Sequence, residues 1–271
     1  MTENRVPTAL SIAGSDSGGG AGIQADLKAF AACGVHGMTA ITAITAQNTI
    51  GVTAVEQISP ATIVAQIRAV ADDIGVDAVK VGMLGTAETV AAVVEALDLV
   101  GDAPVVVDPV MVAESGAALL DDAARRALIE DLLPLAEVVT PNIPEARELT
   151  GLGKRATQEE LARGVLELGP KAVVVTGGHS DELTDVFCDG ERVVEIPGER
   201  HPDGAAHGSG CTHSAALAAF LARGATPLEA AQQAREIASA AVANGLREIG
   251  SGPGPVDVLG LASRPPDRFR P

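Results

Sequence analysis

The stretch TALSIAGSDSGGGAG, residues 8–22, decides the fold class. It begins with an apolar run that predicts a buried strand over residues 8–12 and continues into a loop rich in glycine. A helical pattern follows, so the stretch has the strand–turn–helix order that is typical of a parallel sheet. Because ligands of such sheets bind beyond the carboxyl ends of the strands, this loop is also the first candidate binding site.

Further apolar, β-branched runs alternate with helical patterns along the chain, which favours βαβ units around a mostly parallel sheet. The runs predict strands at residues 8–12, 37–44, 52–57, 78–81, 105–108, 138–140 and 172–176. Residues 184–196 break the alternation, because two short runs flank Asp189-Gly190, a pair typical of a hairpin turn. The hairpin is predicted to form an antiparallel edge of the sheet.

Helix starts are predicted where capping residues precede helical patterns, at Ser59-Pro60, at Thr86, at Thr157 with Glu160, and at Thr226-Pro227-x-Glu229. The last two helices are expected from about residue 210 to 223 and from 227 to 245. Beyond them, residues 251–271 are rich in Gly, Pro and Arg and are predicted to form a loosely ordered tail.

Composition narrows the class of protein. The 271 residues include 19 Lys+Arg and 36 Asp+Glu, a formal net charge of −17, which makes nucleic acid and anionic membranes poor partners. Hydrophobic residues make up 46%, enough for one large core, so residues 1–271 are predicted to form a single domain.

Cysteine usage and the absence of apolar segments indicate a compartment. The three cysteines, Cys33, Cys188 and Cys211, form no C-x-x-C pair, and no apolar run approaches the roughly 18 residues of a membrane span. The first residues also lack the basic and apolar regions of a signal peptide. A cytoplasmic protein is expected.

The glycine-rich loop allows two interpretations. Gly20-x-Gly22-x-x-Ala25 matches the letters of a dinucleotide-binding fingerprint, but residues 39–48 contain no carboxylate to hold a ribose hydroxyl. The dinucleotide interpretation is therefore rejected. The loop binds another ligand, or its glycines serve only a tight turn between strand and helix.

A second glycine-rich segment, HGSGCT at residues 207–212, precedes an Ala/Leu-rich helix. Its backbone N–H groups and the positive end of the helix dipole predict an anion site without side-chain charge. The same dipole is expected to favour the thiolate of Cys211. The alternatives are a flexible turn with a packed cysteine, and a zinc site whose His207-x-x-x-Cys211-x-His213 spacing matches no usual ligand pattern.

Two further segments carry oxygen ligands. Asn142 and Glu145 lie one turn apart at a helix start, where they suit the hydration shell of Mg²⁺ bound to nucleotide phosphates. A capping box between the same residues is an equally good interpretation. Asp108 ends an apolar strand, and its charge there must be paired, hydrated or metal-bound.

These segments together resemble the ribokinase-like superfamily, and within it the hydroxymethylpyrimidine/phosphomethylpyrimidine kinases of thiamine biosynthesis. The matching motifs are IAGSDS (12–17), GGAGIQADLK (19–28), TAQN (45–48), KVGML (80–84), VDPVM (107–111), TPNIPE (140–145), GGH (177–179) and HGSGCT (207–212). The resemblance implies an α/β fold, a three-layer α/β/α sandwich. It also implies transfer of the γ-phosphoryl group of ATP, with Mg²⁺, to 4-amino-5-hydroxymethyl-2-methylpyrimidine and then to its monophosphate, often in a homodimer.

The resemblance also assigns site residues. It implies pyrimidine contacts from Gly14, Asp26, Gln47, Met83 and Val110, where a carboxylate and an amide can read an aminopyrimidine edge. It implies a catalytic segment of Gly208, Ser209, Gly210 and Cys211, nucleotide contacts from Asn142, Thr176, Gly178 and Lys80, and metal-side carboxylates Asp108 and Glu145. The backbone amides of residues 208–211 are expected to matter more than the thiol.

The chain departs from this family pattern at two positions. Relatives usually carry lysine where this chain has Thr176, and many carry another where it has Glu114. Losing a cation beside phosphates removes charge-assisted stabilisation, for which Lys80 or Arg200 are candidate substitutes. The alternatives to the pyrimidine kinase are a pyridoxine/pyridoxal kinase and a pyrimidine-binding regulatory protein with impaired transfer.

Overall fold

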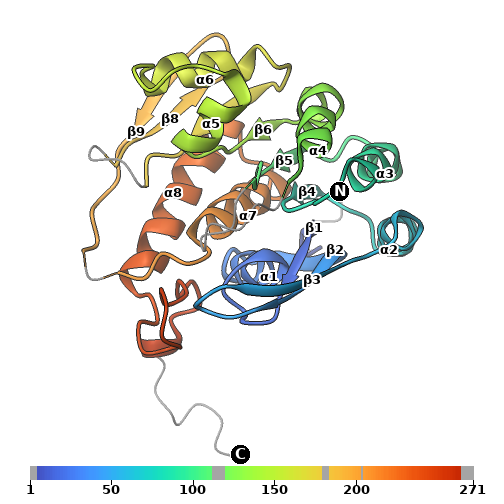
Figure 1. Cartoon of the computed structure of the whole chain (residues 1–271), viewed down its shortest axis with the longest axis horizontal. Coiled ribbons are helices and arrows are strands. Elements are labelled where there is room, and N and C mark those ends of the chain that lie inside the picture. Colours follow the sequence, from blue (N-terminus) through green and yellow to red (C-terminus); the bar gives the residue numbers. More distant parts are fainter. Residues whose placement is uncertain (1–4, 112–119, 179–182, 203, 264–271) are drawn as a thin grey trace, which may run out of the picture.

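The computed structural model describes residues 5–111, 120–178, 183–202 and 204–263. Their strands form one nine-stranded sheet in the order β3-β2-β1-β4-β5-β6-β7-β8-β9 (Figure 1). The strands are β1 (Thr8–Asp16), β2 (His36–Gln47), β3 (Val52–Gln57), β4 (Ala78–Val81), β5 (Val105–Val107), β6 (Val138–Val139), β7 (Ala172–Val175), β8 (Asp185–Cys188) and β9 (Val193–Ile196). The helices are α1 (Gly22–Ala32), α2 (Pro60–Asp73), α3 (Ala87–Leu97), α4 (Asp122–Ala127), α5 (Ile143–Thr150), α6 (Gln158–Leu166), α7 (Ser209–Ala222) and α8 (Pro227–Ala243).

The sheet is parallel in its middle and antiparallel at both edges. Strands β2, β1, β4, β5, β6 and β7 pair in parallel, and the β8–β9 hairpin adds antiparallel to β7, as predicted. Strand β3 also pairs antiparallel, with β2, which the sequence analysis did not foresee. Only residues 48–51 join these two strands, too few for the crossover that a parallel pair needs.

Side chains of the central strands alternate between two cores. Leu10, Val79 and Val107 face one core, which also contains Ile63 of α2 and Leu161 of α6. The intervening strand residues face a second core shared with α1, α7 and α8 (Figure 1). Because both faces of the sheet are covered, its strands are apolar on both sides, and the three-layer α/β/α prediction is confirmed.

The predicted helix starts are confirmed by their caps. Ser59 accepts a hydrogen bond from the Thr62 amide and Thr86 accepts one from Thr89. Capping boxes join Thr157 with Glu160 and Thr226 with Glu229. Each cap satisfies amides that the first helical turn leaves without an internal partner.

Part of the predicted tail, residues 254–257, is buried, while residues 264–271 lie outside the described residues. Pro255, Val256 and Asp257 are buried. The Leu246 amide donates to the Pro255 carbonyl over 2.8 Å, and the Val256 amide donates to the His207 carbonyl over 3.1 Å. Packing against His207 holds this segment, so it helps to position the loop before α7.

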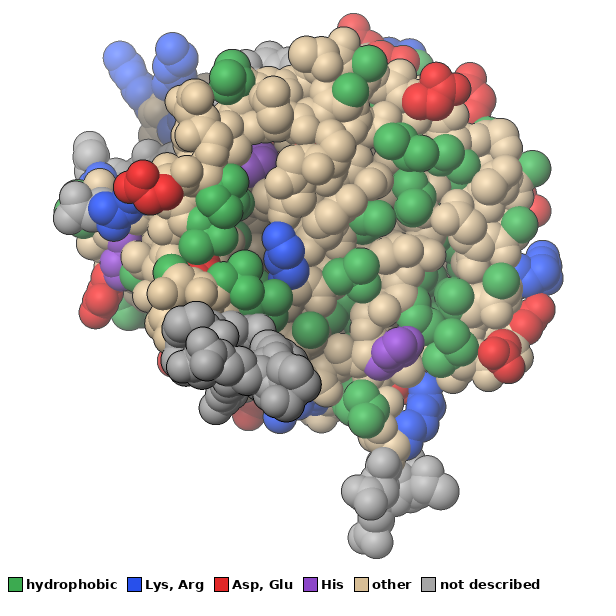
Figure 2. Space-filling view, turned by 90° about the horizontal axis from the view of Figure 1, so that it is seen from below, with side chains coloured by type: hydrophobic (Ala, Val, Ile, Leu, Met, Phe, Trp, Pro, Cys, Tyr) green, Lys and Arg blue, Asp and Glu red, His purple; other side chains and the backbone are tan. Residues whose placement is uncertain are grey.

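None of the described helices combines the length and apolar character that a bilayer crossing requires. Carboxylates lie mainly at the rim of the face in Figure 2, and its middle holds apolar and neutral groups together with a Lys or Arg side chain. The negative charge is therefore not concentrated at the centre of this face.

Candidate active site

A cavity of about 730 Å³ opens beyond the carboxyl ends of the parallel strands. Loops after β1, β4, β5, β6 and β7 contribute to its wall, together with the first turns of α7 and one side of α8. It gathers nearly all of the predicted site residues: Gly14, Gln47, Lys80, Met83, Asp108, Val110, Asn142, Glu145, Thr176, Gly178, Gly208, Ser209, Gly210 and Cys211. Asp26 is the exception and does not line the cavity.

The α7 start meets the first glycine-rich loop backbone to backbone. Gly208 has φ 81°, and a Cβ there would stand 1.8 Å from the carbonyl oxygen of Gly20. Only glycine fits this position, because any other residue would be strained at this φ and its Cβ would clash with the Gly20 carbonyl. The contact places the two glycine-rich segments of the sequence on one wall of the cavity.

The predicted ring of amides is smaller than expected. The Ser209 amide donates to the Ala206 carbonyl over 2.9 Å and is not available to an anion. The Gly210 and Cys211 amides have no hydrogen-bond partner among the described residues, as expected for the first turn of a helix. These amides therefore remain donors for an anion at the cavity wall.

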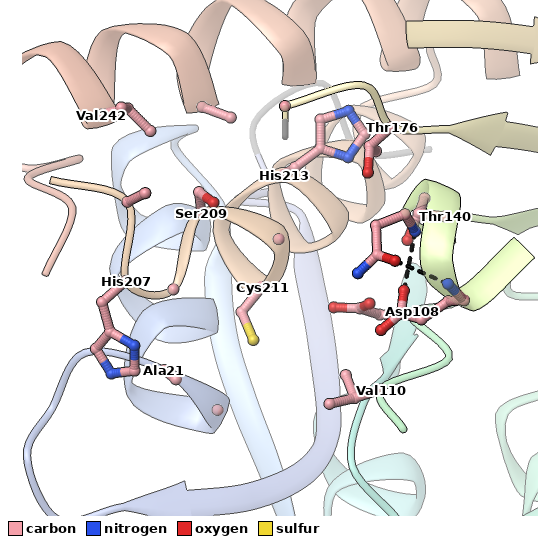
Figure 3. A pocket seen from close by; sticks show the side chains of 18 of the residues that line it. Ala21, Asp108, Val110, Thr140, Thr176, His207, Ser209, Cys211, His213 and Val242 are labelled. Carbon is pink, nitrogen blue, oxygen red and sulfur yellow. Dashed lines mark hydrogen bonds between the residues drawn. The ribbon is translucent and has the colours of Figure 1, made fainter. Parts of the chain in front are cut away.

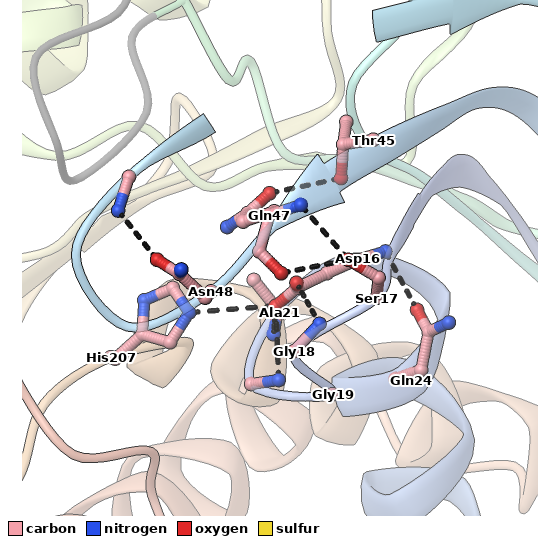
Figure 4. Close-up of polar contacts among 12 residues, drawn as sticks. Asp16, Ser17, Gly18, Gly19, Ala21, Gln24, Thr45, Gln47, Asn48 and His207 are labelled. Atoms are coloured by element: carbon pink, nitrogen blue, oxygen red, sulfur yellow. Dashed lines mark hydrogen bonds and ion pairs between the residues drawn. The ribbon is translucent and has the colours of Figure 1, made fainter. Parts of the chain in front are cut away.

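Asp16 organises the glycine-rich loop. Its carboxylate accepts from the Gly18, Gly20 and Ala21 amides over 2.7, 3.0 and 2.9 Å, and His207 approaches to 3.5 Å (Figure 4). Burial alone would raise the pKa of Asp16, but the bonds from His207 and the amides hold it below its ordinary value. The loop is therefore tied to α7 through an ionised carboxylate.

Gln47 is oriented by two hydroxyl groups. The backbone N–H of Gln47 donates to Ser17 Oγ over 2.9 Å, and the Ser17 hydroxyl donates to the backbone carbonyl of Gln47 over 2.7 Å (Figure 4). The side-chain Oε1 of Gln47 accepts from the Thr45 hydroxyl over 3.1 Å. These contacts fix the Gln47 amide at the cavity wall, which suits a residue that reads a polar ring edge.

Asp26 belongs to a buried ionic cluster and does not line the cavity, so its predicted contact with the pyrimidine stays a prediction. Its carboxylate lies 3.1 Å from the Lys80 ammonium and accepts from Ser11 over 2.5 Å, with neither ion exposed. Burial raises the pKa of Asp26, although Lys80 opposes this shift. Ser11 and Lys80 both donate to Oδ2 of Asp26, while Oδ1 faces Lys80 without a hydrogen-bond partner among the described residues.

Lys80 has its charge engaged by the same cluster. Its ammonium lies between Asp26 and Asp108, whose Oδ2 is 3.8 Å away. Burial would lower the pKa of Lys80, but the carboxylates outweigh burial and raise it. Lys80 therefore lines the cavity as a fixed positive charge that offsets Asp108, and it is a poor substitute for a lysine at position 176.

Asn142 and Glu145 support both interpretations that the sequence allowed. They form a capping box, in which each side chain accepts from the other residue's amide over 2.9 Å, and both line the cavity. Burial, followed by repulsion from Asp108, raises the pKa of Glu145 to about 8. Ser214 donates to Asp108 over 3.0 Å. With this pKa Glu145 is largely protonated near neutral pH, and a cation bound beside the two carboxyl groups would favour its ionised form.

The donor set fits Mg²⁺ better than a metal held by the protein alone. No group of three or more His, Cys, Asp or Glu side chains suited to a metal occurs in the described part of the chain. Mg²⁺ keeps several waters and takes one or two protein carboxylates with substrate phosphates. Asp108 and Glu145 are compatible with that arrangement.

The expectation that the helix dipole favours the Cys211 thiolate is wrong. Burial raises the pKa of Cys211 to about 12, which Lys80 opposes and Asp108 reinforces. The Sγ atom points into the cavity near Val110 and Asp108 (Figure 3). A hydrogen bond from the Gly22 backbone also opposes the rise in the pKa of the thiol. Near neutral pH the residue is therefore a thiol.

Several residues that line the cavity were not predicted as part of this site, among them His213, Asp185 and Arg235. His213 of α7 was considered only as a zinc ligand, while Asp185 of β8 and Arg235 of α8 carried no motif. The one signal available for His213 was a titratable residue in the second turn of a helix that is otherwise built from small, apolar and hydroxyl-bearing residues. Of the family departures, Thr176 lies at the cavity wall, and Glu114 lies outside the described residues, as does His179 of the GGH motif.

A helix N-terminus with free amides, facing carboxylates across a cavity at the end of a parallel sheet, defines a small-molecule kinase of the α/β/α sandwich class. The comparisons narrow the class. The chain belongs to the phosphomethylpyrimidine kinase family, whose model matches residues 16–257.

The relatives carry names that agree with this family. The hydroxymethylpyrimidine/phosphomethylpyrimidine kinase of Rhizobium meliloti is 53% identical over 254 residues, covering 92% of this chain and 95% of the relative. That of Bacillus subtilis is 44% identical over 254 residues, covering 92% and 93%.

Solved structures give the same fold. The pyridoxal kinase from Staphylococcus aureus in complex with ADP has a TM-score of 0.87 at 35% identity, covering 96% of each chain. The phosphomethylpyrimidine kinase from Clostridium difficile has a TM-score of 0.75 at 44% identity, covering 85% of this chain and 96% of that one. Both belong to the kinase class that the cavity defines.

Proposed function

We propose that the chain transfers the γ-phosphoryl group of ATP to 4-amino-5-hydroxymethyl-2-methylpyrimidine and then to its monophosphate, giving the pyrophosphate used in thiamine biosynthesis. One observation carries the proposal. The α7 amides and the residues suited to a pyrimidine open onto the same cavity. Acceptor and donor phosphates can therefore meet in one place, as direct transfer requires.

The acceptor side suits a small flat heteroaromatic ring. Met83 and Val110 provide apolar surface, and the fixed amide of Gln47 provides a polar contact. A Cβ on Gly14 would come within 3.2 Å of the Met83 sulfur, so a larger residue would displace this wall. A ring lying against Met83 would present its polar edge to Gln47.

The donor side suits the transferring phosphoryl group. Phosphoryl transfer passes through a loose transition state and depends on positioning and charge neutralisation. The Gly210 and Cys211 amides would bind the equatorial oxygens at the end of the α7 dipole. Asp108 and Glu145 would hold a Mg²⁺ ion, which when bound neutralises phosphate charge.

A pyridoxal kinase is the second candidate, because the pyridoxal kinase structures from Staphylococcus aureus and Bacillus subtilis both have a TM-score of 0.87 to this chain. Both substrates are small heteroaromatics with a hydroxymethyl group. Steady-state kinetics on the hydroxymethylpyrimidine, its monophosphate and pyridoxal test the ranking. We expect the higher kcat/KM for the pyrimidine, and a higher value for pyridoxal would reverse the assignment.

A pyrimidine-binding regulator with impaired transfer is the remaining alternative, motivated by Thr176. The same kinetic measurements decide between a kinase and a regulator, since turnover of ATP with the pyrimidine excludes a regulator. Tight pyrimidine binding by calorimetry without release of ADP would support it.

The proposal extends to the assembly and its surroundings. The exposed fractions of Ile44, Ile50 and Val55 are 49%, 69% and 42%, all on or between β2 and β3 at one edge of the sheet. Apolar side chains on an open edge favour association, and we propose a homodimer through this hairpin in the cytoplasm. Sedimentation of Ile44→Glu tests the interface, with a monomer expected.

A further inference from the structure

A polar cluster outside the predicted site lines the nucleotide side of the cavity. It consists of His213, Asp185 and Arg235, from α7, β8 and α8. His213 Nε2 lies 3.7 Å from Asp185 Oδ2, and Arg235 Nη1 lies 3.4 Å from Asp185 Oδ1. The exposed fractions of the three side chains are 5%, 0% and 12%.

The cluster leaves its hydrogen-bonding capacity unused. Among the described residues, neither ring nitrogen of His213 has a hydrogen-bond partner, and neither does Asp185 Oδ2 or Arg235 Nε. Buried polar atoms without hydrogen-bond partners are energetically costly, so their concentration in one cavity wall indicates a ligand that completes their hydrogen bonds.

The position of His213 relates it to the phosphate site. His213 lies four residues after Ser209, so both lie on the same side of α7, about one turn apart. Its ring points toward Thr176 at the end of β7 (Figure 3). If the terminal phosphate of a nucleotide reaches the α7 amides, its inner phosphates would lie between His213 and Thr176.

We propose that His213 is a nucleotide-binding residue of this kinase, which donates to an inner phosphate oxygen where Thr176 offers only a hydroxyl. The inference rests on the proposed use of ATP. Thr176 brings no positive charge to this stretch of the polyphosphate, Lys80 is engaged by Asp26, and Arg235 is engaged by Asp185 and the Leu183 carbonyl. A histidine in the wall can supply charge once it is protonated.

Asp185 and Arg235 position this ring. Asp185 accepts from the Gly177 amide over 2.8 Å, which holds it beside His213, and Arg235 balances its charge. Burial lowers the pKa of His213, with Asp185 and Asp108 opposing and Arg235 adding to the shift. Among the described residues, these are the charged groups that shift the pKa of the ring, and they come from β8, the end of β5 and α8. An incoming phosphate adds negative charge and would favour protonation.

The test compares His213→Leu and His213→Gln with the parent chain. Calorimetry with AMP-PCP gives the nucleotide Kd, and kinetics give KM for ATP and for the pyrimidine. We expect His213→Leu to raise the nucleotide Kd and the KM for ATP about tenfold or more, with the KM for the pyrimidine unchanged. His213→Gln keeps a donor and should lose less. Proton uptake on AMP-PCP binding, measured in buffers of different ionisation enthalpy, should vanish in both variants.

A rescue distinguishes a binding role from a structural one. Thr176→Lys in the His213→Leu background should restore most of the nucleotide affinity, and His36→Gln, at the exposed start of β2, is the matched control. An unchanged Kd in folded His213→Leu, or an equal rise in both KM values, overturns the inference. If the parent chain binds AMP-PCP but phosphorylates neither the pyrimidine nor pyridoxal, the proposed function fails while the Kd comparison still decides the role of His213.

Discussion

The Lys80 ammonium lies 3.1 Å from each carboxylate oxygen of Asp26, and neither side chain is exposed. The pair is buried between the sheet and α1, and Oδ2 of Asp108, which lines the cavity, lies 3.8 Å from the Lys80 ammonium. A buried ion pair contributes little net stability, but removing one partner leaves an uncompensated charge. Asp26 therefore supports the site from below by holding Lys80 against Asp108.

Asp26→Asn should lower the free energy of unfolding by about 3 kcal/mol or more, because Lys80 loses its nearest partner. Urea denaturation measures this, and Asp72→Asn, on the exposed side of α2, should change it by less than about 0.5 kcal/mol. Asp26→Leu combined with Lys80→Met should recover part of the loss. If Asp26→Asn keeps full stability and raises only the KM for the pyrimidine, Asp26 contacts the substrate directly.

Gly208→Ala should abolish transfer, because its Cβ would enter the Gly20 carbonyl and its φ is left-handed. We expect kcat/KM to fall at least about a hundredfold, since a shift of one ångström at the reacting groups costs that much. Gly153→Ala is the control, as its Cβ meets no atom within 4 Å. Near-normal kinetics of a folded Gly208→Ala would show that the contact between the Gly20 and Gly208 loops is not needed for activity.

Cys211→Ser should retain measurable transfer, because the thiol is protonated and the neighbouring amides remain. With its pKa raised to about 12, Cys211 should add no inflection to the kcat profile between pH 7 and 10. Its alkylation by iodoacetamide at pH 8, followed by mass spectrometry, should be slower than that of free cysteine. Rapid alkylation, or complete loss of activity in folded Cys211→Ser, would make the thiolate essential.

Glu145→Gln should separate the two roles of the capping box. Glutamine can still accept from the Asn142 amide, so stability should stay within about 0.5 kcal/mol of the parent chain. Loss of the carboxylate should lower kcat and raise the Mg²⁺ concentration needed for half-maximal activity. Glu145→Ala should also lose about 1 kcal/mol of stability. If Glu145→Gln and the parent chain need the same Mg²⁺ concentration for half-maximal activity, Glu145 serves only as a helix cap.

Local patterns were enough to predict the elements of the fold. Strand β3 and strand β4 begin and end at the predicted residues, and the caps at Ser59 and Thr226 lie where the sequence indicates. These features depend on neighbouring residues, so one sequence contains the information. The antiparallel pairing of β3 could be inferred from its short connection to β2, but the order of the strands could not.

The sequence by itself therefore determined the αβ architecture and the segments that line the cavity, since strand ends, caps and glycine turns are properties of short segments. Tertiary structure alone decided the charge state and access of each side chain. Asp26 is held in a buried ion pair by Lys80, which comes from a strand far away in the sequence, and Cys211 stays protonated because burial raises the pKa of its thiol. His213 gained its neighbours Asp185 and Arg235 from two other elements. Electrostatic interactions at a site depend on distances through space, which a linear pattern does not contain.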